Sequence, residues 1–532
     1  MMSPHADSPD SPRSLSIDNR TNGHHSVSNG HSNGHTNGHT NGHVNGKTNG
    51  QINGYGHGHD LSSHLTPVSK DEMHDLLCVG FGPASLAIAV ALHDALDSGE
   101  QLNTRRPKVA FLERQDKFAW HSGMQIPGAK MQISFVKDLA TLRNPRSEFT
   151  FLNYLFKVGR LVQFTNLSTF LPRRIEYEDY MRWCAGHFDD VVSYSEEVVA
   201  VDPIKVSGGS KKIAGFSVTT RNILTKETST RRARHVVIAA GGRPKIPDGF
   251  PQNHPRVLHS SQYKVQTPKA FPDRTKPVRV AIIGGGQSAA EIFNDVHQHF
   301  PNSKSYFLIK DTALRPSDDS PFVNEIFDPN RVDKIYTTTA ERRSEMIAAD
   351  KVTNYGVVRL ELLEDIYEEM YAQRLEHGND ESTWPRRILT QRRVTSIVDA
   401  SAALDLTITN TSDSSNPSTE HLVVDLVYVA AGYQRNIHEL MLQNCRHLMP
   451  GGDEQGKKWE VGRNYAVRFE KAKVEKEAGV WLQGCNENTH GLSDTLLSIL
   501  SVRGGEMVGS IFGADVPAGD ETDGVVNGVD GH

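Results

Sequence analysis

Short apolar runs rich in β-branched residues alternate with longer amphipathic stretches along most of the chain. The runs predict strands and the amphipathic stretches predict helices. A polar, turn-rich stretch at 411–420 predicts a surface loop between strands. Because continuous apolar strands alternating with helices are typical of covered parallel sheets, the pattern indicates an α/β fold. The predicted strands are 76–79, 109–112, 235–239, 278–283 and 426–429, and the predicted helices are 85–96, 288–297 and 360–374.

Both ends of the chain lack this pattern. Residues 1–70 are dominated by Asn-Gly-His repeats and hold ten of the 25 histidines. Apolar residues are too few there to offset the entropy of ordering the chain, so we expect a disordered tail. Clustered imidazoles could instead bind a metal, but a flexible repeat imposes no ligand geometry, and we favour the solvated tail. Residues 514–532, rich in Gly and Asp, are expected to form a flexible C-terminal tail.

Composition narrows the classes of function. A formal net charge of -6 gives no electrostatic reason to expect nucleic-acid or acidic-membrane binding. The four cysteines form no CxxC pair, so neither a zinc site nor a redox dithiol is indicated. There is neither an apolar run of the ~20 residues that span a bilayer nor a signal-peptide core. These features, with few and scattered cysteines, predict a cytoplasmic protein without membrane partners.

The first candidate nucleotide site is the strand–turn–helix segment DLLCVGFGPASL at 75–86. Gly80 permits a tight turn, and Gly82 lets backbone amides approach a pyrophosphate at the helix N-terminus. Ser85 replaces the third glycine of the usual fingerprint. Glu113 ends the next strand, where an acid can bind ribose hydroxyls. We predict that FAD binds here.

The second candidate site repeats this order about 200 residues later, with Gly284, Gly285 and Gly286 in VRVAIIGGGQSAAE at 278–291. The following strand, 305–309, ends at Lys310 instead of an acid, which suits a 2′-phosphate and favours NADPH. A solvated lysine is the alternative, and Arg315 or Arg331 could also serve. Gly turns at 239–242 and 430–433 predict chain passages between domains. We therefore expect an NADPH-binding domain at 247–424 inserted between two parts of an FAD-binding domain, 71–246 and 425–513.

Four further motifs suggest a family. They are KMQISFVKDLAT at 130–141, DSPFVNEIF at 319–327, TNY at 353–355 and HGLSDTLLS at 490–498. With the two glycine turns, residues 71–512 resemble the fungal L-ornithine N5-monooxygenases, which are N-hydroxylating flavoenzymes of siderophore biosynthesis. The resemblance implies two Rossmann-like domains, a small helical substrate-binding region and a homotetramer.

The resemblance also implies roles for individual residues. FAD would be lined by residues from Glu113 through His121, by Gln132, by the backbone of Val198, and by Thr495, Leu496 and Leu497. NADPH would be held by Gly285, Gln287, Ser288, Lys310 (where the family usually has arginine), Asn354, Tyr355 and Gly356. Ornithine would be bound by Lys137, Asn324, Phe327, Asn354 and Ser498.

The implied reaction is hydroxylation of the N5 amine of ornithine with O2, the first committed step toward hydroxamate siderophores. NADPH would reduce FAD and the flavin would carry the oxygen chemistry, so no protein nucleophile is required. Lys137 offers a cation for the ornithine carboxylate. On their own, Lys137 could be a solvated lysine beside Asp138, and Asn324 or Asn354 could cap a helix.

Three other functions stay open at this point. The chain could hydroxylate lysine or another diamine, because one methylene distinguishes these substrates. It could be an NADPH-dependent flavin disulfide reductase, although such an enzyme needs a dithiol that this sequence lacks. It could also be a scaffold without activity, against which the intact glycines at both turns argue.

Overall fold

The computed structural model describes residues 63–205, 212–454 and 456–513. The chain divides into residues 1–59 and 60–532, and every described residue lies in the second unit. The predicted C-terminal tail and the histidine-rich repeats lie outside the described residues. Residues 63–70, however, do not belong to a tail: Leu65 is buried in the core, and His64 Nε2 lies 3.0 Å from Asp97 Oδ1. The packed unit therefore begins earlier than the predicted residue 71.

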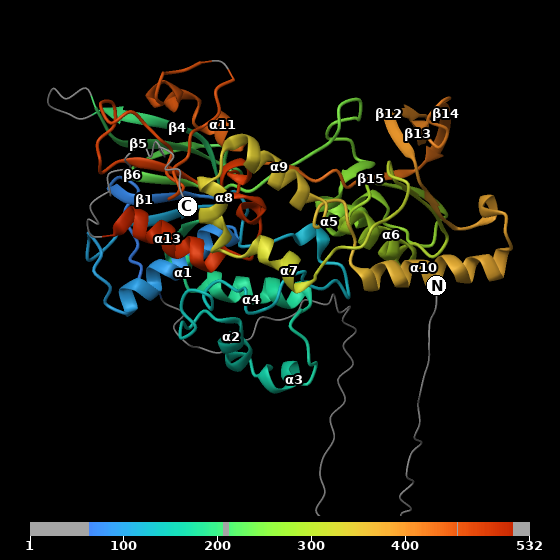
Figure 1. Ribbon diagram of the computed structural model, residues 1–532, viewed down its shortest axis with the longest axis horizontal. Coiled ribbons are helices and arrows are strands. Elements are labelled where there is room, and N and C mark those ends of the chain that lie inside the picture. The colour runs from blue at the N-terminus through green and yellow to red at the C-terminus, as the bar shows by residue number, and fades with distance from the viewer. Residues whose placement is uncertain (1–62, 206–211, 455, 514–532) are drawn as a thin grey trace, which may run out of the picture. The chain divides into compact units, whose positions relative to one another are not determined.

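The first sheet has seven strands in the order β3-β2-β1-β6-β5-β4, with β17 also paired to β6. Strands β1, β2, β3, β6 and β17 are parallel, whereas β4 and β5 are antiparallel to their neighbours. Helices α1 and α13 pack together beside this sheet (Figure 1). The bounds are β1 Met73–Val79, β2 Val109–Leu112, β3 Val192–Ser193, β4 Glu196–Lys205, β5 Ile213–Asn222, β6 Thr228–Ile238, β17 Gly479–Leu482, α1 Pro83–Asp97, α4 Arg174–Gly186 and α13 Leu500–Phe512.

The second sheet has five parallel strands in the order β11-β10-β9-β15-β8. We predicted that the inserted segment ends at residue 424, but β15 pairs with β9 and β8, so this sheet continues to Val429. The bounds are β8 Val257–His259, β9 Val278–Ile283, β10 Ser303–Leu308, β11 Arg386–Leu389, β15 Leu426–Val429, α5 Tyr263–Ala270, α6 Gln287–His299 and α10 Leu360–His377.

A three-stranded antiparallel sheet follows β11 and lies next to the second sheet in Figure 1. Its strands are β12 Arg392–Ala400, β13 Ala403–Asn410 and β14 Ser418–Val424. The loop predicted at 411–420 begins where expected, but its last three residues belong to β14, where Thr419 pairs with Thr409. The polar side chains that suggested a loop lie on an exposed strand.

The chain passes twice between the two sheets, at the two predicted Gly turns. Gly241 has φ +69 and Gly432 has φ +76, and both are left-handed conformations that favour glycine. Directly after them, β7 Arg243–Pro244 and β16 Tyr433–Gln434 pair as an antiparallel ribbon. The two passages are therefore hydrogen-bonded to each other, which confirms the predicted turns.

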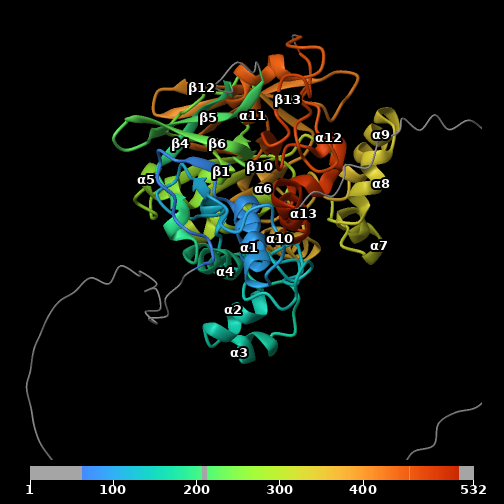
Figure 2. The same cartoon turned by 90° about the vertical axis from the view of Figure 1, so that its left-hand side faces the viewer.

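Short helices supply the predicted small helical region. Segment 321–351 forms α7, η4, α8 and α9, and α8 and α9 contact α12, which follows β17 (Figures 1 and 2). None of the described helices is both long and apolar enough to cross a membrane. The remaining bounds are α7 Pro321–Asn324, η4 Glu325–Phe327, α8 Arg331–Thr337, α9 Ala340–Lys351, α12 Glu487–His490, η7 Leu492–Thr495, α2 Phe151–Lys157, α3 Leu161–Thr165, α11 Ile437–Met441, η1 Ser122–Met124, η2 Asp189–Val191, η3 Ser260–Gln262, η5 Glu381–Thr383 and η6 Gln443–Leu448.

Candidate active site

The first glycine turn joins β1 to α1 and leaves the start of the helix open. Gly80 has φ +88, and a Cβ there would lie 2.8 Å from Ala239 O, so a side chain is excluded. A Cβ on Gly82, the N-cap of α1, would meet nothing within 4 Å. Among the described residues no side chain caps this helix, and its first turn contains no acid. Free amide donors and the positive end of the helix dipole therefore face open space, which suits a pyrophosphate.

Glu113 follows β2 and lies directly beside this turn. The Phe81 N–H donates to Glu113 Oε2 (2.7 Å), and the Gln115 N–H donates to Oε1 (2.8 Å). Each oxygen keeps a further lone pair, so the carboxylate can still accept a hydroxyl. The Glu196 N–H donates to Glu113 O, which brings the start of β4 to this point. Val198 lies at an irregularity in the β4–β5 register, where the backbone ladder is interrupted.

The second turn, between β9 and α6, is built in the same way. Gly284 has φ +139, and a Cβ there would lie 2.7 Å from Ala430 O. Gly286 is the N-cap of α6, again with no side-chain cap in the described structure and no acid in the first turn. A Cβ on Gly286 would lie 3.5 Å from the Cα of Gly356, so the turn faces the segment predicted to touch the nicotinamide.

Lys310, Arg315 and Arg331 were candidates for a 2′-phosphate, and Arg315 is exposed, with no side-chain partner among the described residues. Lys310 directly follows β10 and is exposed, without an ion pair or side-chain hydrogen bond in the described part of the chain. Its neighbour Asp311 places Oδ2 4.0 Å from a Cβ on Gly285, so Lys310 lies beside the turn. Arg331 is held on α8 by an ion pair with Asp350 (3.1 Å). The structure therefore disfavours Arg331, and of the two exposed cations Lys310 is the one whose neighbour Asp311 lies next to the turn.

The predicted ornithine-binding residues converge from three segments. Lys137 Nζ lies 3.9 Å from Asp328 Oδ1. The hydroxyl of Ser498, which is buried, donates to Phe327 O (3.2 Å). Asn324 Nδ2, one turn earlier, donates to Asp319 O (2.9 Å), and the Asn324 side chain makes no cap hydrogen bond to η4, which Asn324 precedes. These contacts connect the loop at 137, the turn at 324–328 and the segment at 498.

The alternative that Lys137 is solvated beside Asp138 does not hold. The Asp138 carboxylate is buried and accepts the backbone N–H groups of Ala140 (2.9 Å), Thr141 (2.6 Å) and Phe151 (2.8 Å). Burial raises the pKa of Asp138, while these hydrogen bonds lower it in part. Asp138 therefore shapes the turn, and Lys137 faces Asp328.

A second group of contacts joins the predicted nicotinamide segment to the segment that would close over the flavin. The Tyr355 hydroxyl lies 3.0 Å from Glu487 Oε2 and 3.2 Å from Thr495 Oγ1. Glu487 also pairs with Lys351 (2.5 Å). Asn354 directly precedes Tyr355. Lys351 and Glu487 could not be predicted as members of this group from the sequence, because neither lies within one of the motifs.

Of the residues predicted to contact the flavin, His121 lies beside the second chain passage. His121 has φ +49, and its ring lies 4.8 Å from Trp120 and 6.2 Å from Tyr433 of β16. Gln132 is exposed and has no side-chain partner among the residues of known placement. Leu496 and Leu497 are half-buried. Exposed polar and half-buried apolar groups of this kind can contact a flat heterocyclic ligand.

A polar clamp, which the sequence analysis did not predict, connects the two sheets beside the second turn. It consists of Arg174, Glu291, Gln287, Arg359 and the carbonyl of Met131. Arg174 donates to both Glu291 oxygens (2.9 and 2.7 Å), and Gln287 Nε2 donates to Glu291 Oε1 (3.0 Å). The Arg359 N–H donates to Gln287 Oε1 (2.9 Å), and Arg359 Nη1 donates to Met131 O (3.0 Å). The Gln287 side chain is therefore engaged, and its backbone N–H is the group left for a phosphate.

The fold and site define a protein with two dinucleotide-binding units that face each other across a cluster of polar residues. The family described as L-lysine 6-monooxygenase/L-ornithine 5-monooxygenase matches residues 72–435. The chain belongs to this family.

Individual relatives, compared by sequence and by structure, support this family membership. The chain is 56% identical over 470 residues to an L-ornithine N(5)-monooxygenase of Cochliobolus heterostrophus, covering 85% of this chain and 88% of the relative. The ornithine hydroxylase PvdA from Pseudomonas aeruginosa superposes with a TM-score of 0.74 at 35% identity, covering 83% of this chain and 99% of that one. A Kutzneria sp. 744 ornithine N-hydroxylase, solved with reduced FAD, NADP+ and L-ornithine, gives a TM-score of 0.73 at 33% identity, with coverages of 83% and 99%.

Proposed function

We propose that the protein is an FAD- and NADPH-dependent monooxygenase that hydroxylates the N5 amine of L-ornithine with O2. The product would be N5-hydroxyornithine, the first committed intermediate of hydroxamate siderophore biosynthesis. The observation that carries this proposal is the convergence of Lys137, the 324–328 turn and Ser498. The names of the fungal and bacterial relatives support it.

The residues present fit both cofactors, because both glycine turns leave uncapped helix N-termini among the described residues. When bound, the flavin would supply the redox chemistry that activates O2 with electrons from NADPH. We propose FAD contacts from Gly80, Gly82, Glu113, His121, Gln132, Val198, Thr495, Leu496 and Leu497. We propose NADPH contacts from Gly284, Gly285, Gly286, Gln287, Ser288, Lys310, Asn354, Tyr355 and Gly356.

The protein groups would bind and orient the amino acid. Lys137 would pair with its carboxylate, which competes with Asp328 for the same ammonium group. Asn324, Asn354 and the backbone around Phe327 would accept or donate hydrogen bonds, and Ser498 would orient the side-chain amine. Leu496 and Leu497 would exclude water. No protein side chain needs to act as a nucleophile.

We propose that the first sheet belongs to the FAD-binding domain and the second to the NADPH-binding domain. The two parts of the first would be the segments around 63–246 and 430–513, because Leu65 is buried in its core, with the inserted domain ending at Val429 because β15 pairs in the second sheet. We further propose a cytoplasmic location, which the four cysteines support because none is in a disulfide.

The test uses purified protein with FAD, NADPH and a panel of amines, and it measures hydroxylamine product together with NADPH oxidation. We expect product from L-ornithine at a rate that greatly exceeds the rate with L-lysine or with diamines. Product from lysine and none from ornithine would overturn the substrate assignment. A colourless protein that does not oxidise NADPH would overturn the assignment as an oxidoreductase.

We also propose that the protein is a homotetramer, because it exposes two separate apolar faces. One lies on α2, α3 and the loop after α3, with Phe156, Val162, Leu167 and Phe170 all more than 60% exposed. The other is a stripe along α10 that consists of Tyr367, Tyr371 and Leu375. Two distinct faces suit a tetramer of dihedral symmetry.

Light scattering should give four subunits for the wild type and fewer for Phe156→Glu. A monomeric wild type would refute the proposal.

A further inference from the structure

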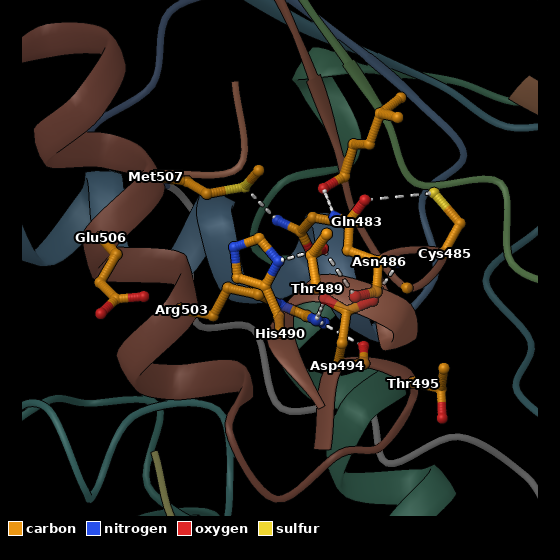
Figure 3. Close-up of polar contacts among 12 residues, drawn as sticks. Gln483, Cys485, Asn486, Thr489, His490, Asp494, Thr495, Arg503, Glu506 and Met507 are labelled. Carbon is orange, nitrogen blue, oxygen red and sulfur yellow. Dashed lines mark hydrogen bonds and ion pairs between the residues drawn. The ribbon is translucent and has the colours of Figure 1, made fainter. Parts of the chain in front are cut away.

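Asp494 directly precedes the segment 495–498, which we call the closure segment, and forms a fully buried ion pair with Arg503 of α13. Arg503 is 2% exposed and Asp494 is 0% exposed. Arg503 Nη1 donates to Asp494 Oδ1 (2.9 Å) and also to the backbone oxygen of Asp494 (2.5 Å). Figure 3 shows Arg503 reaching from α13 to Asp494, next to Thr495. One guanidinium therefore fixes both the side chain and the backbone of the residue that precedes the closure segment.

The same aspartate is tied to the first sheet. The Asn486 N–H donates to Asp494 Oδ2 (2.7 Å; Figure 3). Asn486 Nδ2 donates to Leu482 O (2.6 Å) at the end of β17. Because α13 packs on α1, Arg503 is itself held by the helix that begins at the first glycine turn. Asp494 is thus anchored from two sides to the unit that would bind FAD.

Beyond this anchor, the closure segment extends to the proposed ligands. Thr495 Oγ1 lies 3.2 Å from the Tyr355 hydroxyl, and the Ser498 hydroxyl donates to Phe327 O. Asp494 and Arg503 take part in neither contact, and both are buried away from the surface where a ligand could bind. Their effect on a ligand must therefore pass through residues 495–498.

Stability alone does not explain this pair. Taking two charges out of water costs several kcal/mol per ion, and well-packed apolar residues often serve a fold as well or better. What an ion pair adds is a defined geometry, and here that geometry is imposed on the backbone at residue 494. Displacing a reacting group by about 1 Å can lower a rate by about a hundredfold.

We propose that Asp494 and Arg503 are positioning residues that set the orientation of the closure segment over the flavin and the amino acid. The pair would control the affinity for ornithine and the fraction of NADPH oxidation that yields hydroxylated product. This proposal rests on the proposed function. It makes no claim that either residue touches substrate or cofactor.

The test compares Arg503→Lys and Asp494→Asn with Arg143→Lys as full-length FAD-loaded enzymes. Lysine keeps the charge, but its flexible ammonium does not reproduce the guanidinium, whose Nη1 donates to both Asp494 Oδ1 and the backbone oxygen of Asp494. Arg143 is a matched control: it pairs with the buried Asp94 (2.6 Å) and packs against Gly505 of the same helix α13, but it does not contact the closure segment. The measurements are the ornithine KM, kcat, hydrogen peroxide released per NADPH, melting temperature and visible circular dichroism of bound flavin.

We expect Arg503→Lys and Asp494→Asn to raise the ornithine KM about tenfold or more and to raise peroxide release. The visible dichroism should change in both variants, whereas Arg143→Lys should lower only the melting temperature. Equal losses of melting temperature in all three variants, with unchanged KM, coupling and dichroism, would overturn the proposal. If the wild type makes no hydroxyornithine, the proposed function fails, and the dichroism of the two variants alone decides the positioning role. If Arg503→Lys does not fold, the measurements on the nearly isosteric Asp494→Asn decide whether the pair has the positioning role.

Discussion

At the scale of single residues, the two lysines of the candidate site differ in their surroundings. Lys137 lies 3.9 Å from Asp328 and is largely buried. Lys310 is exposed and, among the residues described, has no ionic partner. The energy of a charge contact depends on how well water is excluded. We therefore expect the affinity for ornithine to depend more strongly on Lys137 than the affinity for NADPH depends on Lys310.

Lys137→Ala removes the cation proposed to bind the ornithine carboxylate. A hydrogen bond to a charged group contributes about 1.5–3 kcal/mol, so the ornithine KM should rise about tenfold to a hundredfold. Bound FAD and the rate of flavin reduction by NADPH should stay near wild type. Lys130→Ala, at an exposed lysine seven residues earlier, is the matched control. Equal ornithine kinetics in the two variants would remove Lys137 from the site.

Lys310→Ala tests coenzyme preference. An exposed charge contact with the 2′-phosphate should be lost, so the KM for NADPH should rise about tenfold while the KM for NADH stays constant. NADH serves as the internal control because it lacks the phosphate. Lys310→Arg should lower the KM for NADPH, since a planar fork binds phosphate oxygens in pairs. Parallel changes with both coenzymes would show that Lys310 acts on the fold and not on the phosphate.

At the scale of elements, the apolar strands of the sheet centres were predictable and the polar ones were not. Strands β2, β9 and β15 match their predicted bounds because, apart from Arg279 in β9, they consist of apolar residues. Strands β4 and β5 alternate buried with half-buried positions and include charged residues, so they gave no such signal.

The candidate site was predictable only where a motif is continuous in the sequence. The glycine turns and the four family motifs placed most of its members. The clamp joins residues 117 positions apart, Arg174 and Glu291, and no local pattern indicates such a contact. Asp494 lies within a recognised motif, but its partner Arg503 lies on the next helix. Partners that meet only through tertiary packing cannot be read from local spacing.

The strand β6 carries a histidine that should govern stability in acid. His235 is buried against Trp481 (ring centroids 5.2 Å apart), and burial lowers its pKa from 6.5 to about 4. The folded state therefore binds this proton less readily than the unfolded state does. The contribution of His235 to stability is fully present above pH 6.5 and is lost as the pH falls from 6.5 to about 4, by roughly 3 kcal/mol.

His235→Phe should remove this loss because phenylalanine cannot be protonated and can keep the aromatic contact. The melting temperature of the variant should fall less steeply than that of the wild type between pH 6.5 and 4. His447→Phe, at an exposed histidine, should keep the wild-type slope. A His235→Phe profile parallel to the wild-type profile would contradict the assignment.

At the scale of the whole molecule, the proposed reaction requires NADPH and FAD, bound on different sheets, to meet. The two chain passages pair with each other as β7 and β16, but such a short ribbon alone would allow the sheets to turn. The clamp adds a second connection far from these passages in the sequence. Its Arg174–Glu291 pair is largely buried, so solvent screens it little. The ribbon and the clamp together define how the second glycine turn faces the first sheet.

Glu291→Gln should therefore slow hydride delivery without removing either cofactor. The substitution keeps the size of the side chain but cancels the charge that holds Arg174, and the Gln287 side chain loses its carboxylate acceptor. We expect the anaerobic rate of flavin reduction at saturating NADPH to fall about tenfold, with wild-type FAD content. Glu369→Gln is the control, because Glu369 of α10 pairs with Arg386 of β11 (3.4 Å), and both residues belong to the second sheet and its helices. If Glu291→Gln reduces its flavin as fast as Glu369→Gln does, the clamp does not set the distance between the cofactors, and the paired ribbon must set that distance alone.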